Sequence, residues 1–315
     1  MGLLCIVNTY NLYTLYYDAL LQGKGLIKIS KQIAVVGHLM FLFAAASSLL
    51  LGYGLIAIVV AQACSIFLIR FLSYRVFFTN EFRHLLEQAT PHHRGDVLKL
   101  IYPNAVKVGL TGLGAFLVLR STIIIGSLFL PLNQGSYGIS MQLIFVLSGI
   151  AGTYIFTFLP KIAKLRVEGN SHEIADLYLK GQLIVIATYF VGGVALITLG
   201  EWAITLIGSE TRLLAPSILL VALLISLLET NHSVAATILL TKNHVPFFKP
   251  ALLSCAATII LLLLLLETST MGVWALVLAP GIVQASYQNW KWPLEVHLDL
   301  GINSRKILSG SWLRG

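Results

Sequence analysis

Three ionisable side chains, Arg120, Glu229 and Asp18, lie inside long apolar stretches of this sequence. A charge at the centre of a membrane helix costs about 2.5–3.5 kcal/mol on insertion scales, so it faces a cavity or a partner. Arg120 lies near the middle of its stretch, and we interpret it as an anchor for an anionic substrate group such as a phosphate. The guanidinium fork binds phosphate through two parallel hydrogen bonds. The alternative is a buried ion pair between Arg120 and an acid such as Glu229.

A polar run, ETNHS at 229–233, interrupts the apolar stretch that contains Glu229. A polar insertion at this depth is typical of a kink or of a wall that faces the protein interior. Glu229 is either the counter-ion for a coupling cation or proton, or the partner of Arg120. Asn231 and His232 share the predicted wall, and His232 is a weaker candidate for proton coupling.

The first apolar stretch carries a second group of polar residues, Asn8, Asn11, Thr14 and Asp18. At 100° per helical residue they fall within one arc of about 120°. This arc predicts either the wall of a polar cavity or a set of hydrogen bonds to neighbouring helices, since polar side chains also join membrane helices.

The elements that position these residues are long apolar segments. The 315 residues are 57% hydrophobic and 11% charged, whereas soluble domains carry about 25% charged residues. A helix that crosses a bilayer needs about 20 mostly apolar residues. The sequence therefore predicts an all-α integral membrane protein with about nine transmembrane helices, at 3–21, 33–51, 55–78, 105–130, 137–160, 181–207, 214–240, 250–267 and 272–290.

The basic residues alternate between the connections of these segments. All but two of the 21 Lys and Arg residues lie in, or next to, every second connection along the chain. The two exceptions are Arg120 and Arg212. Because Lys and Arg collect on the cytoplasmic side of a membrane, this pattern predicts a cytoplasmic C-terminus and an outside N-terminus. The net charge of +8 therefore indicates membrane topology, and no nucleic-acid partner is expected.

No pattern indicates a cofactor, a metal site or an enzyme. Cys5, Cys64 and Cys255 lie in apolar stretches without metal-type spacing, as small buried hydrophobic residues do. The pair His92-His93 has no further clustered ligands, so it is interpreted as part of a solvated loop. Walker and GxGxxG motifs are missing from the sequence, which excludes an ATPase within this chain.

The hydrophilic stretch 79–104 is the longest in the chain and divides three segments from six. We therefore expect an N-terminal part at 1–78, a cytoplasmic connection at 79–104, a C-terminal part at 105–290 and a cytoplasmic tail at 291–315. Within the C-terminal part, the stretch 161–180 is expected to be a short interfacial helix.

Several short motifs resemble a known family. They are GYGLIAIVVAQ at 52–62, SYGISMQL at 136–143, FLPKIAKLRVEGN at 158–170, TKNHVPF at 241–247 and YQNWKWPLEV at 287–296. Their order and spacing resemble the polysaccharide flippases of the MOP superfamily, particularly the Wzx-type O-antigen transporters, over nearly the whole chain. The resemblance implies two six-helix lobes that face each other across a central cavity and rock between two open states.

The resemblance also implies a function, a location and partners. The expected protein is a transporter of the bacterial inner membrane that moves an undecaprenyl-diphosphate-linked oligosaccharide to the periplasmic leaflet. Its partners would be this lipid-linked oligosaccharide, membrane lipids and other polysaccharide assembly proteins. By position, Arg120 corresponds to a cationic cavity residue of the family, although no fixed motif includes it.

The chain departs from the family in its number of spans, because the family has at least twelve and nine are expected here. If 79–104 connects the lobes, then 1–78 is the remnant of a first lobe that lacks its first three helices. Two alternatives to a flippase stay open: an ion-coupled multidrug/cation exporter of the MATE type, and a membrane-embedded glycan polymerase or acyltransferase. A non-transporting fragment or scaffold is a third.

Overall fold

The computed structural model describes residues 2–78, 94–206 and 208–303, and every regular element in these ranges is a helix. Seven of the described helices are long and apolar enough to cross a membrane. Their most apolar windows are only 11–33% buried within the protein, so most of their apolar surface needs lipid or another protein surface around it. The predicted all-α, multi-pass membrane architecture is confirmed.

The chain divides into two compact units, Met1–His93 and Arg94–Gly315, which are described separately. Unit 1 contains α1 (Gly2–Thr14), α2 (Tyr16–Gly23), α3 (Ile27–Leu50) and α4 (Leu55–Phe77). Between α3 and α4, Gly52 and Gly54 have φ angles of 82° and 54°, a conformation that glycine adopts without a steric penalty. These glycines form the tight turn that joins α3 to α4 as a helical hairpin.

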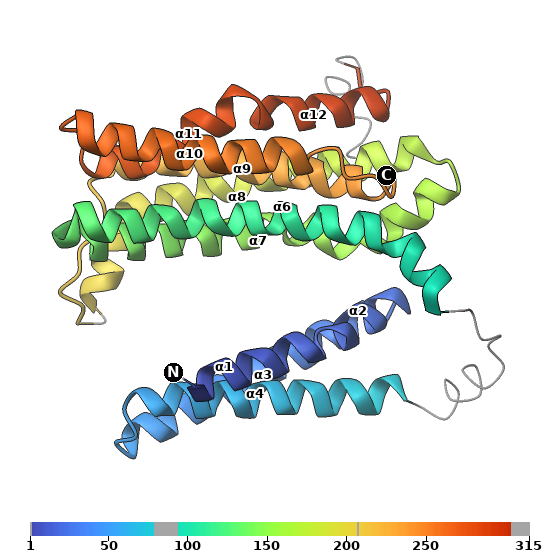
Figure 1. Ribbon diagram of the computed structural model, residues 1–315, viewed down its shortest axis with the longest axis horizontal. Helices are drawn as coiled ribbons and strands as arrows, with labels where there is room; N and C mark the ends of the chain where they lie inside the picture. The colour runs from blue at the N-terminus through green and yellow to red at the C-terminus, as the bar shows by residue number, and fades with distance from the viewer. Residues whose placement is uncertain (1, 79–93, 207, 304–315) are drawn as a thin grey trace. The chain divides into compact units, whose positions relative to one another are not determined.

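Unit 2 is a bundle of helices, shown in green to red in Figure 1. It contains α6 (Arg94–Phe129), η1 (Pro131–Asn133), α7 (Gln134–Val167), α8 (Ser171–Leu206), α9 (Pro216–Leu240), α10 (Phe248–Thr268), α11 (Val273–Ser286) and α12 (Gln288–Asp299).

Small residues bring the helices of unit 2 close together. A Cβ atom on Gly181 of α8 would lie 2.5 Å from the side chain of Ile155 on α7, and one on Gly281 of α11 would lie 2.4 Å from that of Ile225 on α9. Membrane helices use such residues because close backbone approach maximises van der Waals packing where no hydrophobic effect drives association. Helix α9 contacts α7, α8, α11 and α12, so its polar run lies among several helices.

The structure differs from the sequence-based expectation at four places. Seven of the nine predicted segments coincide with single long helices, but the first is divided at Leu15 and the last at Tyr287, whose φ and ψ of −145° and −58° are not helical. Residues 94–104, expected in a connection, form the first turns of α6. The expected interfacial helix at 161–180 belongs instead to α7 and α8, which a turn at 168–170 joins. The other expected parts, 79–93 of the connection and 304–315 of the tail, lie outside the described residues.

Candidate functional site

A pocket of about 250 Å³ lies within unit 2. Helix α6 forms one wall, and α9, α10, α11 and α12 form the others. The lining residues are Thr111, Gly114, Ala115, Val118, His232, Ser233, Ala236, Thr237, Leu240, Phe247, Ala251, Gln284, Gln288 and Trp292.

Three polar or aromatic side chains of the pocket come from either side of the break at Tyr287. Gln288 and Trp292 lie four residues apart on α12 and so share one helical face, and Gln284 comes from α11. Gln288 donates from Nε2 to Ser254 Oγ on α10 at 2.9 Å and accepts from Trp292 Nε1 at 3.2 Å. Gln284 Oε1, by contrast, is buried and accepts no hydrogen bond from any described residue.

Two members of the polar run, His232 and Ser233, line the pocket. The Nδ1 atom of His232 lies 2.7 Å from Oδ1 of Asn289 on α12. As the amide of Asn289 is placed, its oxygen accepts a hydrogen bond from Nδ1 of His232. The contact joins α9 to the start of α12 beside the pocket.

An ion network anchors the far end of α12. The carboxylate of Asp299 pairs with Arg166 Nη1 at the end of α7 at 2.9 Å, and with Lys242 Nζ just after α9 at 2.6 Å. Arg166 and Asp299 are only 16% and 13% exposed, whereas Lys242 is 45% exposed. The carboxylate therefore ties three helices together and fixes the helix that carries Gln288 and Trp292.

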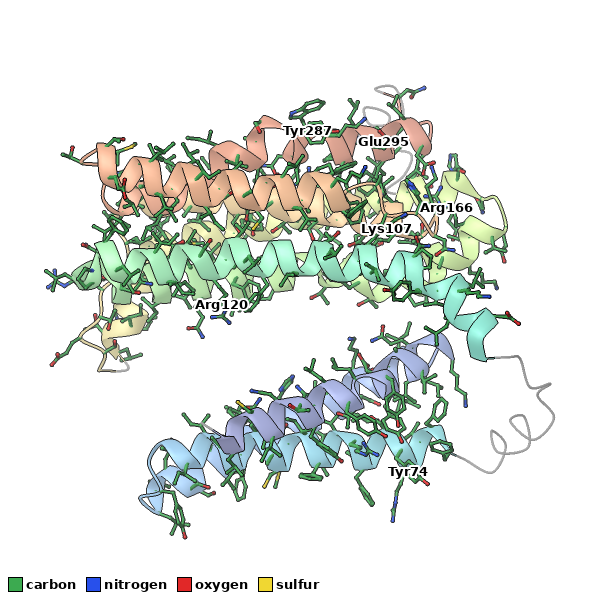
Figure 2. The ribbon with its side chains drawn as sticks, in the orientation of Figure 1. Tyr74, Lys107, Arg120, Arg166, Tyr287 and Glu295 are labelled. Atoms are coloured by element: carbon green, nitrogen blue, oxygen red, sulfur yellow. The ribbon has the colours of Figure 1, made fainter. Side chains whose placement is uncertain are left out.

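Arg120, the predicted anion anchor, does not line the pocket. Its side chain is exposed on α6, with the guanidinium carbon 5.5 Å from the centre of the Phe116 ring. Figure 2 shows Arg120 on the side of α6 that faces away from α10, roughly opposite Lys107. Across the described ranges it forms no ion pair with Glu229 or with any other acid. The ion-pair interpretation of Arg120 is therefore not supported by the geometry.

The other residues of the polar run make separate contacts. Glu229 is half-buried on α9, and no described cation pairs with it. Asn231 accepts from Gln182 Nε2 of α8 at 3.1 Å. Thr230 lies 2.7 Å from Ser148 and 2.8 Å from Tyr189, measured between hydroxyl oxygens. The run thus binds α9 to α7, α8 and α12 at once.

In unit 1 the predicted polar arc forms hydrogen bonds between and within helices. Asn8 Oδ1 accepts from Gln62 of α4 at 3.0 Å, and Asp18 accepts from Ser30 of α3 and from Gln22. The carbonyl of Asn11 accepts from Thr14 Oγ1 at 2.9 Å. These contacts fit the alternative in which the arc joins neighbouring helices by hydrogen bonds.

One cluster in unit 1 escaped sequence analysis. The guanidinium of Arg70 lies 5.3–5.5 Å from the ring centres of Tyr10, Tyr13 and Tyr17, the distance range of cation–π contacts. The three tyrosines are three and four residues apart in the first apolar segment, a spacing that predicts one shared helical face. The sequence pattern alone used Arg70 only as one of the basic residues that indicate membrane topology.

The described residues hold no group of three or more His, Cys, Asp and Glu side chains that could bind a metal ion. Of the three cysteines that we expected to be buried, only Cys255 is; Cys5 is exposed and Cys64 is half-buried. The chemistry of the pocket is that of uncharged hydrogen bonding beside an aromatic ring.

Fold and pocket together define an all-α, multi-pass membrane protein with an uncharged pocket inside its second unit. No protein-family model, curated protein or solved structure matches the chain.

Proposed function

We propose that this protein is a flippase that moves an undecaprenyl-diphosphate-linked oligosaccharide across the bacterial inner membrane, with its C-terminus in the cytoplasm. The motif resemblance and the alternation of basic residues support this proposal. Every described connection on the side away from most basic residues is short, the longest being 207–215 between α8 and α9. Such connections leave little room for a catalytic domain, which favours a transporter over a membrane-embedded glycan enzyme.

The observation that carries the proposal is the position of Arg120. It lies nine residues before Phe129, the end of α6, or about 14 Å along a helix that rises 1.5 Å per residue. Half of a 30 Å hydrocarbon core is about 15 Å, so a span that ends with α6 carries the guanidinium near mid-membrane depth. An exposed cation there, with no acid paired to it among the described residues, needs an anionic ligand or an aqueous cavity. A diphosphate is one such ligand, because the guanidinium fork binds phosphate oxygens through two parallel hydrogen bonds.

A multidrug/cation antiporter is the second candidate, and Glu229 is the observation that favours it. A half-buried carboxylate without a paired cation among the described residues could hold a proton or an organic cation. The two candidates are distinguished by Glu229→Gln. In a flippase anchored by Arg120, this change leaves surface glycan mostly intact; in an antiporter it abolishes cation export, measured by efflux of a fluorescent organic cation.

The main test is complementation in a strain that lacks its own flippase. This chain is compared with a longer version that carries three additional N-terminal spans of a related flippase, because the resemblance predicts such spans. Restored surface glycan, measured by gel mobility of extracted lipopolysaccharide, supports the proposal. Failure of both versions at normal membrane expression contradicts it.

In the complementing version, Arg120→Ala should lower surface glycan about tenfold or more, as expected when a charge-assisted hydrogen bond to substrate is lost. Arg120→Lys should retain part of the activity, because lysine keeps the charge but lacks the planar fork. Arg75→Ala is the matched control: Arg75 is also exposed and lies over a ring, that of Phe71, but in the last turn of α4. Wild-type transport by Arg120→Ala would eliminate the anchor.

A further inference from the structure

A second hollow, of about 440 Å³, lies between residues 249–257 of α10 and residues 283–287 at the end of α11. We call it the lateral groove. Its volume falls in the range of roughly 300–1,000 Å³ that is typical of ligand sites. Figure 1 shows α10 and α11 next to each other in unit 2. Most residues that line the groove are exposed, so it opens to the outside of the bundle, where a membrane-spanning helix meets lipid.

The wall that α10 contributes has a charge at one end and apolar side chains above it. Lys249, Leu253 and Ala257 follow one another at four-residue intervals and so share one helical face. Helix α10 has 21 residues and is therefore about 30 Å long, the thickness of the hydrocarbon core. Lys249 in its first turn lies at the membrane surface, and Ala257 lies about 12 Å deeper. The wall thus runs through most of one leaflet, which is about 15 Å deep.

The opposite wall combines small side chains with interfacial aromatic rings. Ser286 already donates its hydroxyl proton to the carbonyl of Val283 at 2.6 Å, so it leaves a narrow, satisfied surface. The ring of Tyr287 is 38% exposed and its centre lies 5.6 Å from that of Trp290, which is 50% exposed. Tyrosine and tryptophan collect at the level of the lipid headgroups. Both walls therefore place the polar end of the groove at the membrane surface.

Lys249 makes the groove a site for an anion. It is exposed, it is the only charged residue of the lining, and no acid pairs with it among the residues that the structure describes. The neighbouring Lys291, by contrast, is engaged by Glu295 at 2.8 Å. The lining also lacks a carboxylate that could accept the ammonium of a zwitterionic headgroup. A lysine ammonium binds phosphate as a point charge.

We propose that the lateral groove binds one anionic phospholipid of the surrounding bilayer, with its phosphate at Lys249 and one acyl chain along Leu253 and Ala257. A second copy of this chain is disfavoured, because it would bury the charge of Lys249 where the lining offers no acid. A polyprenyl carrier is disfavoured because its chain is several times longer than the wall of the groove. The site needs only the membrane around the protein and goes beyond the proposed transport of a glycan.

The test is native mass spectrometry of the full chain, equilibrated in detergent with lipids of defined headgroup. Phosphatidylglycerol is the anionic probe, phosphatidylethanolamine the zwitterionic one and undecaprenyl phosphate the polyprenyl one. One phosphatidylglycerol per chain should bind about fivefold more tightly than phosphatidylethanolamine, the ratio that corresponds to one lysine at a membrane surface.

Lys249→Ala should abolish this preference, and Lys249→Arg should keep it, because the charge remains. Lys28→Ala is the matched control. Lys28 is also exposed, is also the second residue of its helix, α3, and has no paired acid among the described residues. It should bind phosphatidylglycerol as the unchanged chain does.

Ala257→Trp should fill the deep end of the groove and lower phosphatidylglycerol binding severalfold. Ala256→Trp is its control, because Ala256 is an exposed neighbour on α10 that does not line the groove. The thermal unfolding midpoint without added lipid shows whether both variants fold. If Ala257→Trp does not fold, Lys249→Ala and Lys28→Ala carry the test on their own.

Equal binding of the two phospholipids, or equal loss in Lys249→Ala and Lys28→Ala, overturns the proposal. Tighter binding of undecaprenyl phosphate that is lost in Ala257→Trp also overturns it, as does a dimer that dissociates in this variant, because each assigns the groove to another occupant. Lipid binding and complementation are measured separately. Phosphatidylglycerol binding without complementation contradicts the flippase and supports the groove, and the reverse result supports the flippase and contradicts the groove.

Discussion

Asp299 shows how one carboxylate organises the second unit. It pairs with both Arg166 and Lys242 at the point where the ends of α7, α9 and α12 meet. The two cations differ in environment, since Arg166 is 16% exposed and Lys242 is 45% exposed. An exposed ion pair contributes roughly 0–1 kcal/mol, whereas removing one partner of a shielded pair leaves the other unsatisfied at greater cost.

Asp299→Asn should therefore lower the free energy of unfolding by about 2 kcal/mol, mainly through the unpaired Arg166. Lys242→Ala should cost less than half as much. The measurement is the thermal unfolding midpoint of the purified protein in detergent. Arg166→Met combined with Asp299→Asn should cost less than the sum of the single changes; simple additivity would show that the two side chains do not act as a pair.

At the scale of elements, helix packing depends on glycines at a few contact positions. Gly181 has no room for a Cβ atom, because Ile155 of α7 would lie 2.5 Å away. Gly149 of α7 is a matched position, since a Cβ there would meet nothing within 4 Å. The difference arises from the face of the helix on which each glycine lies, which its sequence neighbours do not reveal.

Gly181→Leu should separate α8 from α7 and destabilise the protein by about 1–3 kcal/mol, the range for overpacking. Gly149→Leu should leave the unfolding midpoint nearly unchanged. Thermal unfolding with monodispersity on a sizing column provides the comparison. Similar midpoints for both variants would contradict the close approach of α7 and α8.

At the scale of the whole molecule, the basic connections predict the orientation in the membrane. The turn at 168–170 and the loop after α9 are flanked by lysines and arginines, whereas Arg212 is the only basic residue in the connections after α8 and α10. The positive-inside rule therefore assigns the two pairs of connections to opposite sides of the membrane.

Single cysteines should reveal this orientation in intact cells, in a background in which Cys5, Cys64 and Cys255 are replaced by serine. A membrane-impermeant maleimide should label Glu210→Cys and Thr270→Cys without permeabilisation, because the basic pattern assigns these positions to the outside. Glu168→Cys and His244→Cys should be labelled only after permeabilisation. Labelling of all four in intact cells, or the reverse pattern, contradicts the proposed orientation.

The sequence by itself determined that this protein lies in a lipid bilayer and that its secondary structure is helical. Its 57% hydrophobic composition and its apolar segments predicted membrane helices, because a backbone in lipid must satisfy its hydrogen bonds internally. It also singled out His232 and Asn231, since polar residues at membrane depth are costly enough to be conspicuous.

Only the tertiary structure decided which polar residues meet. Gln284 and Gln288 were expected at the end of an apolar segment and Trp292 in the cytoplasmic tail. The contact of α12 with α9 and the ion pairs of Asp299 place all three at the pocket of His232. Asn8 and Asp18 instead hydrogen-bond α4 and α3. Helical periodicity tells which residues share a face, but the neighbour of that face depends on contacts between segments far apart in the chain.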